Sequence, residues 1–212
     1  MTDDAFLADL SQARVMAIVR GSDAAAAEAA GAVLLQAGLR FVEVALTTPD
    51  ALGVIERLRA RVPAGARLGA GTVLTPDDVA RVESAGGQFI VTPAVAESVE
   101  EAVCRSLPSV IGALSPTEIL SARARGATVV KLFPSSVGGP RYLRAIRDPF
   151  PEIPLLAVGG VDLEAAKEYL HAGAIGVGVG GPLIGDAASG GDLEALGRRA
   201  QAFVALSDAD RP

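Results

Sequence analysis

Short runs rich in β-branched residues alternate along the chain with segments rich in Ala, Leu, Arg and Glu, at a nearly constant interval. The eight runs cover residues 15–20, 41–46, 67–73, 88–93, 109–114, 128–133, 154–160 and 174–181. Near-continuous apolar strands separated by amphipathic helices are typical of a parallel sheet whose outer face is covered by helices. Eight units in 212 residues, about 26 per unit, predict an α/β fold of the (β/α)8 TIM-barrel type. A flavodoxin-like open sheet, which needs fewer strands, is the alternative.

The segments between the runs carry helix signals. Helices are expected over 23–37, 49–62, 75–85, 95–106, 116–125, 139–147, 162–172 and 191–206. Several of them open with a hydroxyl followed by Pro, which suits the cap and first turn of a helix. Residues 3–13 predict an extra N-terminal helix at the bottom of the barrel, and residues 207–212 predict a frayed end. Because no linker or composition break divides the chain, a single domain over residues 1–212 is expected.

Composition excludes several kinds of site and partner. With one cysteine, Cys104, and one histidine, His171, the chain can form no intrachain disulfide and predicts no His/Cys zinc site. We expect Cys104 to be buried on a helix and His171 to stabilise a helix C-terminus. A net charge of −6 without a Lys/Arg cluster predicts no nucleic-acid partner.

Mean hydropathy is high at +0.39, so a membrane segment has to be considered. The longest apolar stretch, 14 residues from Ala172, is rich in Gly and shorter than the ~20 residues of a spanning helix, so no membrane span is expected. The acidic start MTDDAF lacks the pattern of a signal peptide, which predicts a cytoplasmic protein. The apolar content then indicates strands buried on both faces and a subunit interface.

Lys131 is one of only two lysines among 19 basic residues, and it lies inside the apolar run TVVKLF. An unpaired ammonium group is costly to bury. A desolvated lysine can lose its proton and attack a carbonyl, which arginine cannot do. Lys131 is therefore a candidate for imine formation with a substrate carbonyl. The alternative is a strand-end lysine whose ammonium group reaches solvent.

Glu43 is the second unexpected residue, in the run FVEVAL. Side chains alternate along a strand, so Glu43 shares a face with Phe41 and Ala45. Outward faces of a barrel meet helices and are apolar, so we expect this carboxyl group to point into the barrel, where it could shuttle protons. The alternative is an ion pair with Arg40 or with a basic residue on a neighbouring strand.

Candidate anion-binding elements follow four of the predicted strands, where glycine lets backbone N–H groups approach an anion closely. They are Gly69, Gly71 and Thr72; Phe133 to Ser136, including Ser135; Gly159 and Gly160; and Gly178, Gly180 and Gly181. In a barrel, the loops after strands seven and eight frequently hold phosphate.

Taken in order, these segments resemble a known family over essentially the whole chain: the 2-keto-3-deoxy-6-phosphogluconate (KDPG) and 2-keto-3-deoxy-6-phosphogalactonate (KDPGal) aldolases. That family also includes 4-hydroxy-2-oxoglutarate (KHG) aldolase. The segments are AIVRG (17–21), VEVALTTP (42–49), GAGTVLTPDD (69–78), FIVTPA (89–94), VVKLFPSSVGGP (129–140) and LAVGGV (156–161).

The resemblance implies a class I aldolase without metal or other cofactor, assembled as a homotrimer. Its substrate would be a small phosphorylated keto acid, cleaved to pyruvate and D-glyceraldehyde 3-phosphate. By position, Lys131 matches the Schiff-base lysine and Glu43 the general acid/base. The matching substrate-binding positions are Thr72, Pro93 and Phe133 in the pyruvate pocket, and Gly159, Gly160, Gly180 and Gly181 around the phosphate.

Three positions bear on the choice of substrate. Thr47 and Val158 stand where gluconate-type members commonly have Arg and Thr, while Arg20 matches an arginine of the galactonate-type enzymes. Without an arginine at 47, Arg20 is the expected partner of the substrate carboxylate, because a guanidinium group can bind it bidentately. These features favour a substrate of the galactonate series, and KHG is the alternative substrate.

Two other functions stay open at the level of sequence. A phosphate-binding barrel isomerase or epimerase could use Glu43 as base and Lys131 as an electrostatic stabiliser, although a single histidine argues against a metal-dependent epimerase. A non-catalytic binder of sugar-acid phosphates is the other, because fold alone does not give function.

Overall fold

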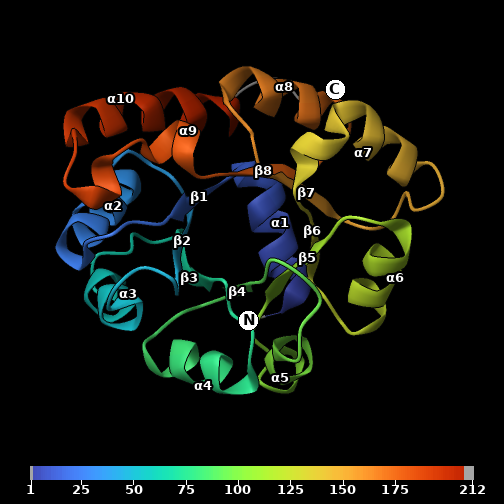
Figure 1. Cartoon of the computed structure of the whole chain (residues 1–212), viewed down its shortest axis with the longest axis horizontal. Coiled ribbons are helices and arrows are strands. Elements are labelled where there is room, and N and C mark those ends of the chain that lie inside the picture. Colours follow the sequence, from blue (N-terminus) through green and yellow to red (C-terminus); the bar gives the residue numbers. More distant parts are fainter. Residues whose placement is uncertain (1, 208–212) are drawn as a thin grey trace.

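The computed structural model describes residues 2–207, which form a closed barrel of eight parallel strands in sequential order (Figure 1). The strands are β1 (Val15–Val19), β2 (Phe41–Ala45), β3 (Arg67–Gly71), β4 (Ile90–Val91), β5 (Ser109–Ala113), β6 (Val129–Leu132), β7 (Leu155–Val158) and β8 (Gly176–Val179). Because β8 pairs with β1, the sheet closes and has no free edge. The predicted (β/α)8 barrel is confirmed, and the open-sheet alternative is wrong.

A helix follows each strand on the outside of the barrel, and one helix, α1 (Asp3–Ala13), precedes β1 (Figure 1). The other helices are α2 (Ala24–Gln36), α3 (Ala51–Arg59), α4 (Pro76–Ser84), α5 (Ser98–Cys104), α6 (Pro116–Ala124), α7 (Gly139–Arg147), α8 (Leu163–His171), α9 (Gly181–Ile184) and α10 (Leu193–Val204). Short 3-10 turns are η1 (Ser135–Val137), η2 (Ala187–Ser189) and η3 (Ala205–Ser207). In α4 and α6, Thr75 and Ser115 form capping boxes with Asp78 and Glu118, and Pro stands in the first turn.

The structure departs from the sequence expectations in several places. The fourth strand is only the pair Ile90–Val91, and α9 and η2 were not expected between β8 and the last helix. Cys104, expected to be buried, is exposed at the end of α5. The expected frayed end falls largely on residues 208–212, which lie outside the described residues, while Ser207 belongs to η3.

The extra N-terminal helix α1 closes the barrel at the end where the strands begin. Phe6 of α1 packs edge-on against Phe41, the first residue of β2, with ring centroids 5.3 Å apart. Phe89 completes this aromatic cluster, and all three rings are fully buried. With the lower end filled, the interior is accessible only from the end where the strands terminate, which is where barrel enzymes place their active sites.

Two apolar layers make up the core, one inside the barrel and one between strands and helices. Phe41 of β2 and Val129 of β6 belong to the inner layer. Side chains two residues apart along a strand share a face, so Glu43 and Lys131 also point inward, one step nearer the strand ends. The inward direction expected for Glu43 is confirmed.

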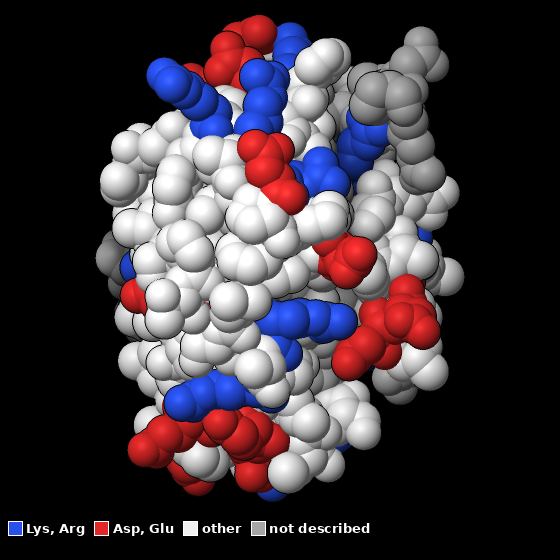
Figure 2. Space-filling view, turned by 90° about the vertical axis from the view of Figure 1, so that its right-hand side faces the viewer, with Lys and Arg blue, Asp and Glu red and all other residues white. Residues whose placement is uncertain are grey.

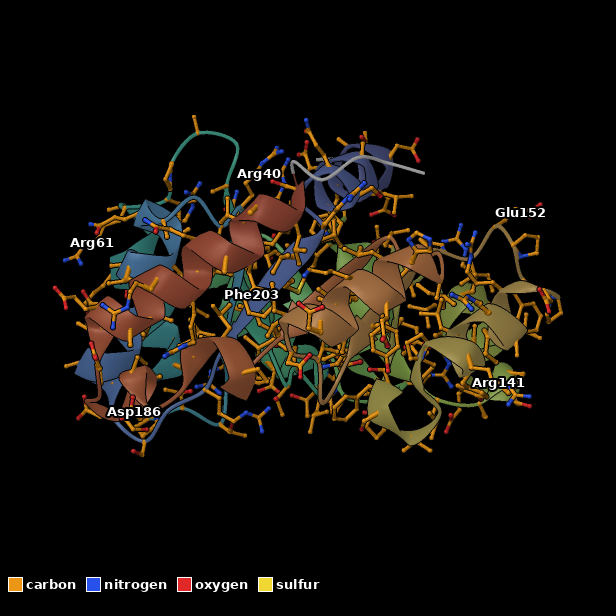
Figure 3. The ribbon with its side chains drawn as sticks, turned by 90° about the horizontal axis from the view of Figure 1, so that it is seen from above. Arg40, Arg61, Arg141, Glu152, Asp186 and Phe203 are labelled. Carbon is orange, nitrogen blue, oxygen red and sulfur yellow. The ribbon has the colours of Figure 1, made fainter. Side chains whose placement is uncertain are left out.

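Charged side chains of both signs are mixed on the face toward α7, with wide uncharged areas between them (Figure 2). Seen from above, α8 and α10 lie side by side along one flank, with Arg61 at one end of the molecule and Arg141 at the other (Figure 3). Phe203 of α10 is 3% exposed and packs in the outer core layer. No helix within residues 2–207 is long and apolar enough to cross a membrane.

Candidate active site

Lys131 lies inside the barrel on β6, only 7% exposed, with its Nζ 4.8 Å from the centre of the Phe133 ring. The alternative in which its ammonium group extends into solvent is therefore wrong. Burial lowers the pKa of Lys131 below the usual 10.5, and the neighbouring Glu43 opposes part of this effect. A lysine in this environment has a larger neutral fraction than an exposed one.

Glu43 lies inside the barrel on β2 and is 2% exposed. Its Oε2 has no hydrogen-bond partner among the described residues. Burial raises the pKa of Glu43, although Lys131 and Arg20 act in the opposite direction. Arg40 instead donates to Gln12 and to the Gly65 carbonyl, so the predicted alternative of a Glu43–Arg40 pair is wrong.

Gly71, the last residue of β3, leaves the space that the Glu43 carboxyl group occupies. A Cβ atom at position 71 would lie 2.5 Å from Glu43 Oε1, closer than any real contact. Gly71 thus leaves room for the side chain of Glu43 on the neighbouring strand, and the anion-binding role expected from the sequence stays a prediction.

Arg20 follows β1 at the mouth of the barrel, where its Nη2 donates to Thr72 Oγ1 over 3.3 Å. Thr72 has a left-handed backbone with φ of 61°, which is unusual for a β-branched residue and typical of functional sites. Thr47 is exposed, whereas Thr48 beside it is buried and accepts a hydrogen bond from the Gly21 N–H. From the sequence, Thr48 was expected only as part of the start of the following helix, not as a residue of the site.

A pocket of about 280 Å³ opens between the ends of β1, β6, β7 and β8. It brings together seven of the predicted site residues: Arg20, Phe133, Val158, Gly159, Gly160, Gly180 and Gly181. The N–H groups of Gly160 and Gly181 donate no hydrogen bond to any of the described residues. Arg20 is the only charged side chain in the lining, so the pocket suits an anion.

A second pocket of about 270 Å³ lies on the other side of Phe133 and is lined by Pro93 and Gly112. The turn that carries Pro93 is held by Thr92, which is fully buried. Its Oγ1 donates to the Ala94 carbonyl over 2.6 Å and accepts from the Gly112 N–H over 3.1 Å. Sequence reasoning missed Thr92, because an apolar run with one threonine gives no sign of such contacts.

Ser135, predicted to bind substrate, lines neither pocket. Its side chain is fully buried and donates to the Gly159 carbonyl over 3.1 Å. Tyr169 of α8, which was not predicted, donates to the Ser135 carbonyl over 2.9 Å. Among residues 2–207, no group of three or more His, Cys, Asp or Glu side chains could hold a metal ion.

The fold and these side chains define a (β/α)8-barrel protein with a buried amine and a buried carboxyl group inside the barrel and a glycine-lined pocket at its mouth. The family model described as KDPG and KHG aldolase matches residues 7–198. The chain belongs to the KDPG and KHG aldolase family. The resemblance found in the sequence is confirmed, and with it the class of enzyme, an aldolase and therefore a lyase.

Individual relatives agree with this assignment. A probable 2-dehydro-3-deoxy-6-phosphogalactonate aldolase of Rhizobium meliloti is 36% identical over 197 residues, which cover 92% of each chain. A structure described as native KDPGal superposes with a TM-score of 0.84 at 34% identity, over 90% of this chain and 92% of its own. A Legionella pneumophila KDPG aldolase with pyruvate captured as a covalent carbinolamine gives a TM-score of 0.77 at 26% identity, over 94% and 95%.

Proposed function

We propose that this chain is a class I aldolase that cleaves a 2-keto-3-deoxy-6-phospho sugar acid to pyruvate and D-glyceraldehyde 3-phosphate. The observation that carries the proposal is the burial of the Lys131 amine inside the barrel together with the carboxyl group of Glu43. The covalent pyruvate adduct named for the Legionella pneumophila relative supports the same chemistry here. Neither alternative function, an isomerase or a non-catalytic binder, requires a lowered pKa at Lys131.

In the first steps, neutral Lys131 Nζ attacks the C2 ketone of the substrate and forms a carbinolamine. Glu43 donates a proton to the departing hydroxyl group, so that water leaves and a protonated imine forms. The raised pKa of Glu43 favours the protonated form that this step needs.

The protonated imine then withdraws electrons from C3. Glu43, now ionised, takes the proton of the C4 hydroxyl group directly or through water, and the C3–C4 bond breaks. Glyceraldehyde 3-phosphate leaves, and the remaining neutral enamine is protonated at C3 and hydrolysed to pyruvate. Covalent catalysis thereby replaces an unstable carbanion with an enamine.

The substrate carries two anionic groups, a phosphate and a carboxylate. The mouth of the barrel offers two kinds of hydrogen-bond donor, backbone N–H groups and the Arg20 side chain. The phosphate is assigned to the pocket of Gly159, Gly160, Gly180 and Gly181, whose backbone groups approach an anion closely. The carboxylate is assigned to the side where Arg20 contacts Thr72. Arg20 is also part of the pocket lining, so its positive charge attracts both ends of the substrate.

We propose the galactonate series as the preferred substrate, because Thr47 and Val158 replace the Arg and Thr of gluconate-type enzymes. The test is a coupled pyruvate assay with purified enzyme and three substrates: KDPGal, KDPG and KHG. A higher kcat/KM for KDPGal is the expected result. Equal kcat/KM values for KDPGal and KDPG would overturn the proposed preference. Activity on KHG alone would overturn the proposal that the substrate is phosphorylated.

Trapping with borohydride tests the covalent step itself. Incubation with pyruvate and borohydride should add one reduced pyruvyl group, and peptide mapping by mass spectrometry should place it on Lys131. An unmodified Lys131 in an active enzyme would contradict the proposed chemistry and favour the isomerase alternative.

The pH dependence of trapping follows from the lowered pKa of Lys131. Only the neutral amine attacks, and its fraction rises with pH until the pH exceeds the pKa. We therefore expect the initial rate of adduct formation to rise with pH and to reach its plateau below 10.5, the usual value for lysine. A rate that still rises in proportion to hydroxide concentration at pH 10.5 would contradict a desolvated lysine.

Gly71→Ala should disturb Glu43 specifically, because the new Cβ would lie 2.5 Å from Oε1. A displacement of the carboxyl group by about 1 Å predicts a fall in kcat of about 10- to 100-fold. Gly197→Ala on α10 is the matched control, since its Cβ would lie 3.8 Å from the Val33 side chain, an ordinary contact. The control should keep full activity, and equal kcat values for the two variants would show that Gly71 has no such role.

A homotrimer is proposed for the assembled enzyme, in keeping with the resemblance. Apolar side chains exposed in residues 2–207 support a subunit interface, because four of the five large ones belong to consecutive units of the barrel, from the loop after β3 to η1. They are Leu74, Val103, Leu120 and Val137. Sedimentation equilibrium should give three times the chain mass of 21.4 kDa, and a monomer would contradict the proposal. Cytoplasmic location stays a prediction.

A further inference from the structure

Two loops of the mouth pack directly on each other: the loop after β6, which follows the lysine, and the loop after β7, which carries Gly159 and Gly160. Both glycines have positive φ, 104° and 70°, which a residue without a Cβ adopts at little steric cost, and the same lack of a side chain gives their backbones access to other conformations. A Cβ on Gly159 would lie 3.2 Å from Pro134, and one on Gly160 would lie 3.0 Å from the Cβ of Ser136. Because the two loops pack so closely, their relative position depends on the hydrogen bonds that join them.

Two buried hydroxyl groups connect the loops to each other and to α8. The Ser135 hydroxyl donates to the Gly159 carbonyl over 3.1 Å, which joins the loop after β6 to the loop after β7. Tyr169 of α8 donates to the Ser135 carbonyl over 2.9 Å. Ser135 is fully buried and Tyr169 is 3% exposed, so water cannot readily replace either bond. We call this pair of residues the Ser135–Tyr169 clamp.

We propose that the Ser135–Tyr169 clamp positions the Gly159–Gly160 loop for the phosphate group of the substrate. This inference rests on the proposed function, in which that loop binds the phosphate. Neither residue touches the substrate in this proposal, and both are positioning residues. The clamp would set the direction of the free Gly160 N–H group, because this group belongs to the peptide that follows Gly159.

The physical reason lies in the Gly159 carbonyl. If the Ser135 hydroxyl is removed, the half-buried Gly159 carbonyl loses its donor, and a carbonyl that is shielded from water without a hydrogen-bond partner is unfavourable. A glycine pair can relieve that cost by rotating its peptides toward water in the pocket. Such a rotation would misdirect the N–H groups of the loop. Lys131 would be affected less, because it is held by the register of β6 between Gly112 and Leu156.

The proposal predicts that the clamp affects binding of the phosphorylated substrate and leaves imine formation with pyruvate nearly unchanged. In Ser135→Ala and Tyr169→Phe, the KM for the phosphorylated substrate should rise about tenfold or more, with kcat changed far less. The rate at which borohydride traps pyruvate should stay within about twofold of the unaltered enzyme, since pyruvate carries no phosphate. A purely structural loss would slow trapping and cleavage together.

Tyr142→Phe is the matched control. Tyr142 of α7 also donates to a loop carbonyl, that of Leu114 over 2.8 Å, but it joins α7 to the loop after β5. The same hydroxyl group is removed without touching the Gly159–Gly160 loop, so KM should not change. The clamp would be refuted if Tyr142→Phe raised KM as much as Tyr169→Phe, or if the two clamp variants left KM unchanged.

Direct binding of inorganic phosphate separates this proposal from the proposed function. Calorimetry with the full chain should show phosphate binding about tenfold weaker in Ser135→Ala and Tyr169→Phe than in the unaltered protein and Tyr142→Phe. Equal phosphate affinity in all four proteins would overturn the clamp even if cleavage were confirmed. A failure of trapping and cleavage in the unaltered protein would overturn the aldolase reaction, and the phosphate affinities would still decide on the clamp.

Discussion

Lys131→Arg is expected to abolish cleavage, with kcat reduced by about 10⁴-fold or more, although the substitution keeps the positive charge. Arginine stays protonated at any pH at which the enzyme is folded, so it offers no lone pair for attack on the C2 ketone. Among residues 2–207, Glu43 is the one buried carboxylate that could pair with a guanidinium group at position 131. The measurement is pyruvate release in the coupled assay, together with borohydride trapping, which should give no adduct.

The chain supplies a matched control for this substitution in its only other lysine. Lys167 is an exposed residue of α8 that pairs with Glu164 at 2.6 Å. Lys167→Arg preserves that surface ion pair and should keep full activity. If Lys131→Arg retained more than about one hundredth of the original kcat, imine formation at this residue would be wrong, because no smaller effect is compatible with loss of the nucleophile.

Glu43→Gln should lower kcat by about 10²- to 10⁴-fold, the usual contribution of a general acid or base. The amide has nearly the shape of the carboxyl group, so the packing against Gly71 is preserved while the proton transfers are lost. The limb of the pH–rate profile that reports Glu43 should disappear as well. We expect no loss of stability, since the carboxyl group is buried with one oxygen unpartnered.

Glu168→Gln on α8 is the corresponding control, because Glu168 is exposed on a helix outside the barrel. It should keep both kcat and the original pH profile. If Glu43→Gln cleaved the substrate at the same rate as this control, the proton transfers would have to be assigned to another group or to water.

Much of the fold could be predicted from local patterns. Strands and helices alternate because apolar runs and amphipathic segments alternate, and this was enough to predict the barrel and α1 at its lower end. The shortness of β4, the extra helix α9 and the exposure of Cys104 could not be predicted, since each depends on how neighbouring segments pack. The face on which Cys104 lies is one example: a small apolar side chain on a short helix carries no signal for burial or exposure.

Within the site, side-chain type and strand register indicated Lys131 and Glu43, whereas partners distant in sequence stayed invisible. Tyr169 bonds to Ser135 across 34 residues, and Arg20 bonds to Thr72 across 52. No local pattern connects such residues. The role of Gly71 belongs to the same class, since the need for a glycine there comes from the Glu43 carboxyl group of the adjacent strand.

The sequence by itself determined the order of the elements, the family and the inward face of Lys131 and Glu43, because the period of two along a strand is a property of the local backbone. Only the tertiary structure decided the properties that make chemistry possible. Closure of β8 on β1 encloses the two groups and removes water from them, which shifts both pKa values toward the neutral forms. Desolvation and hydrogen bonding depend on what surrounds a group in space, and those surroundings come from segments far apart in the chain.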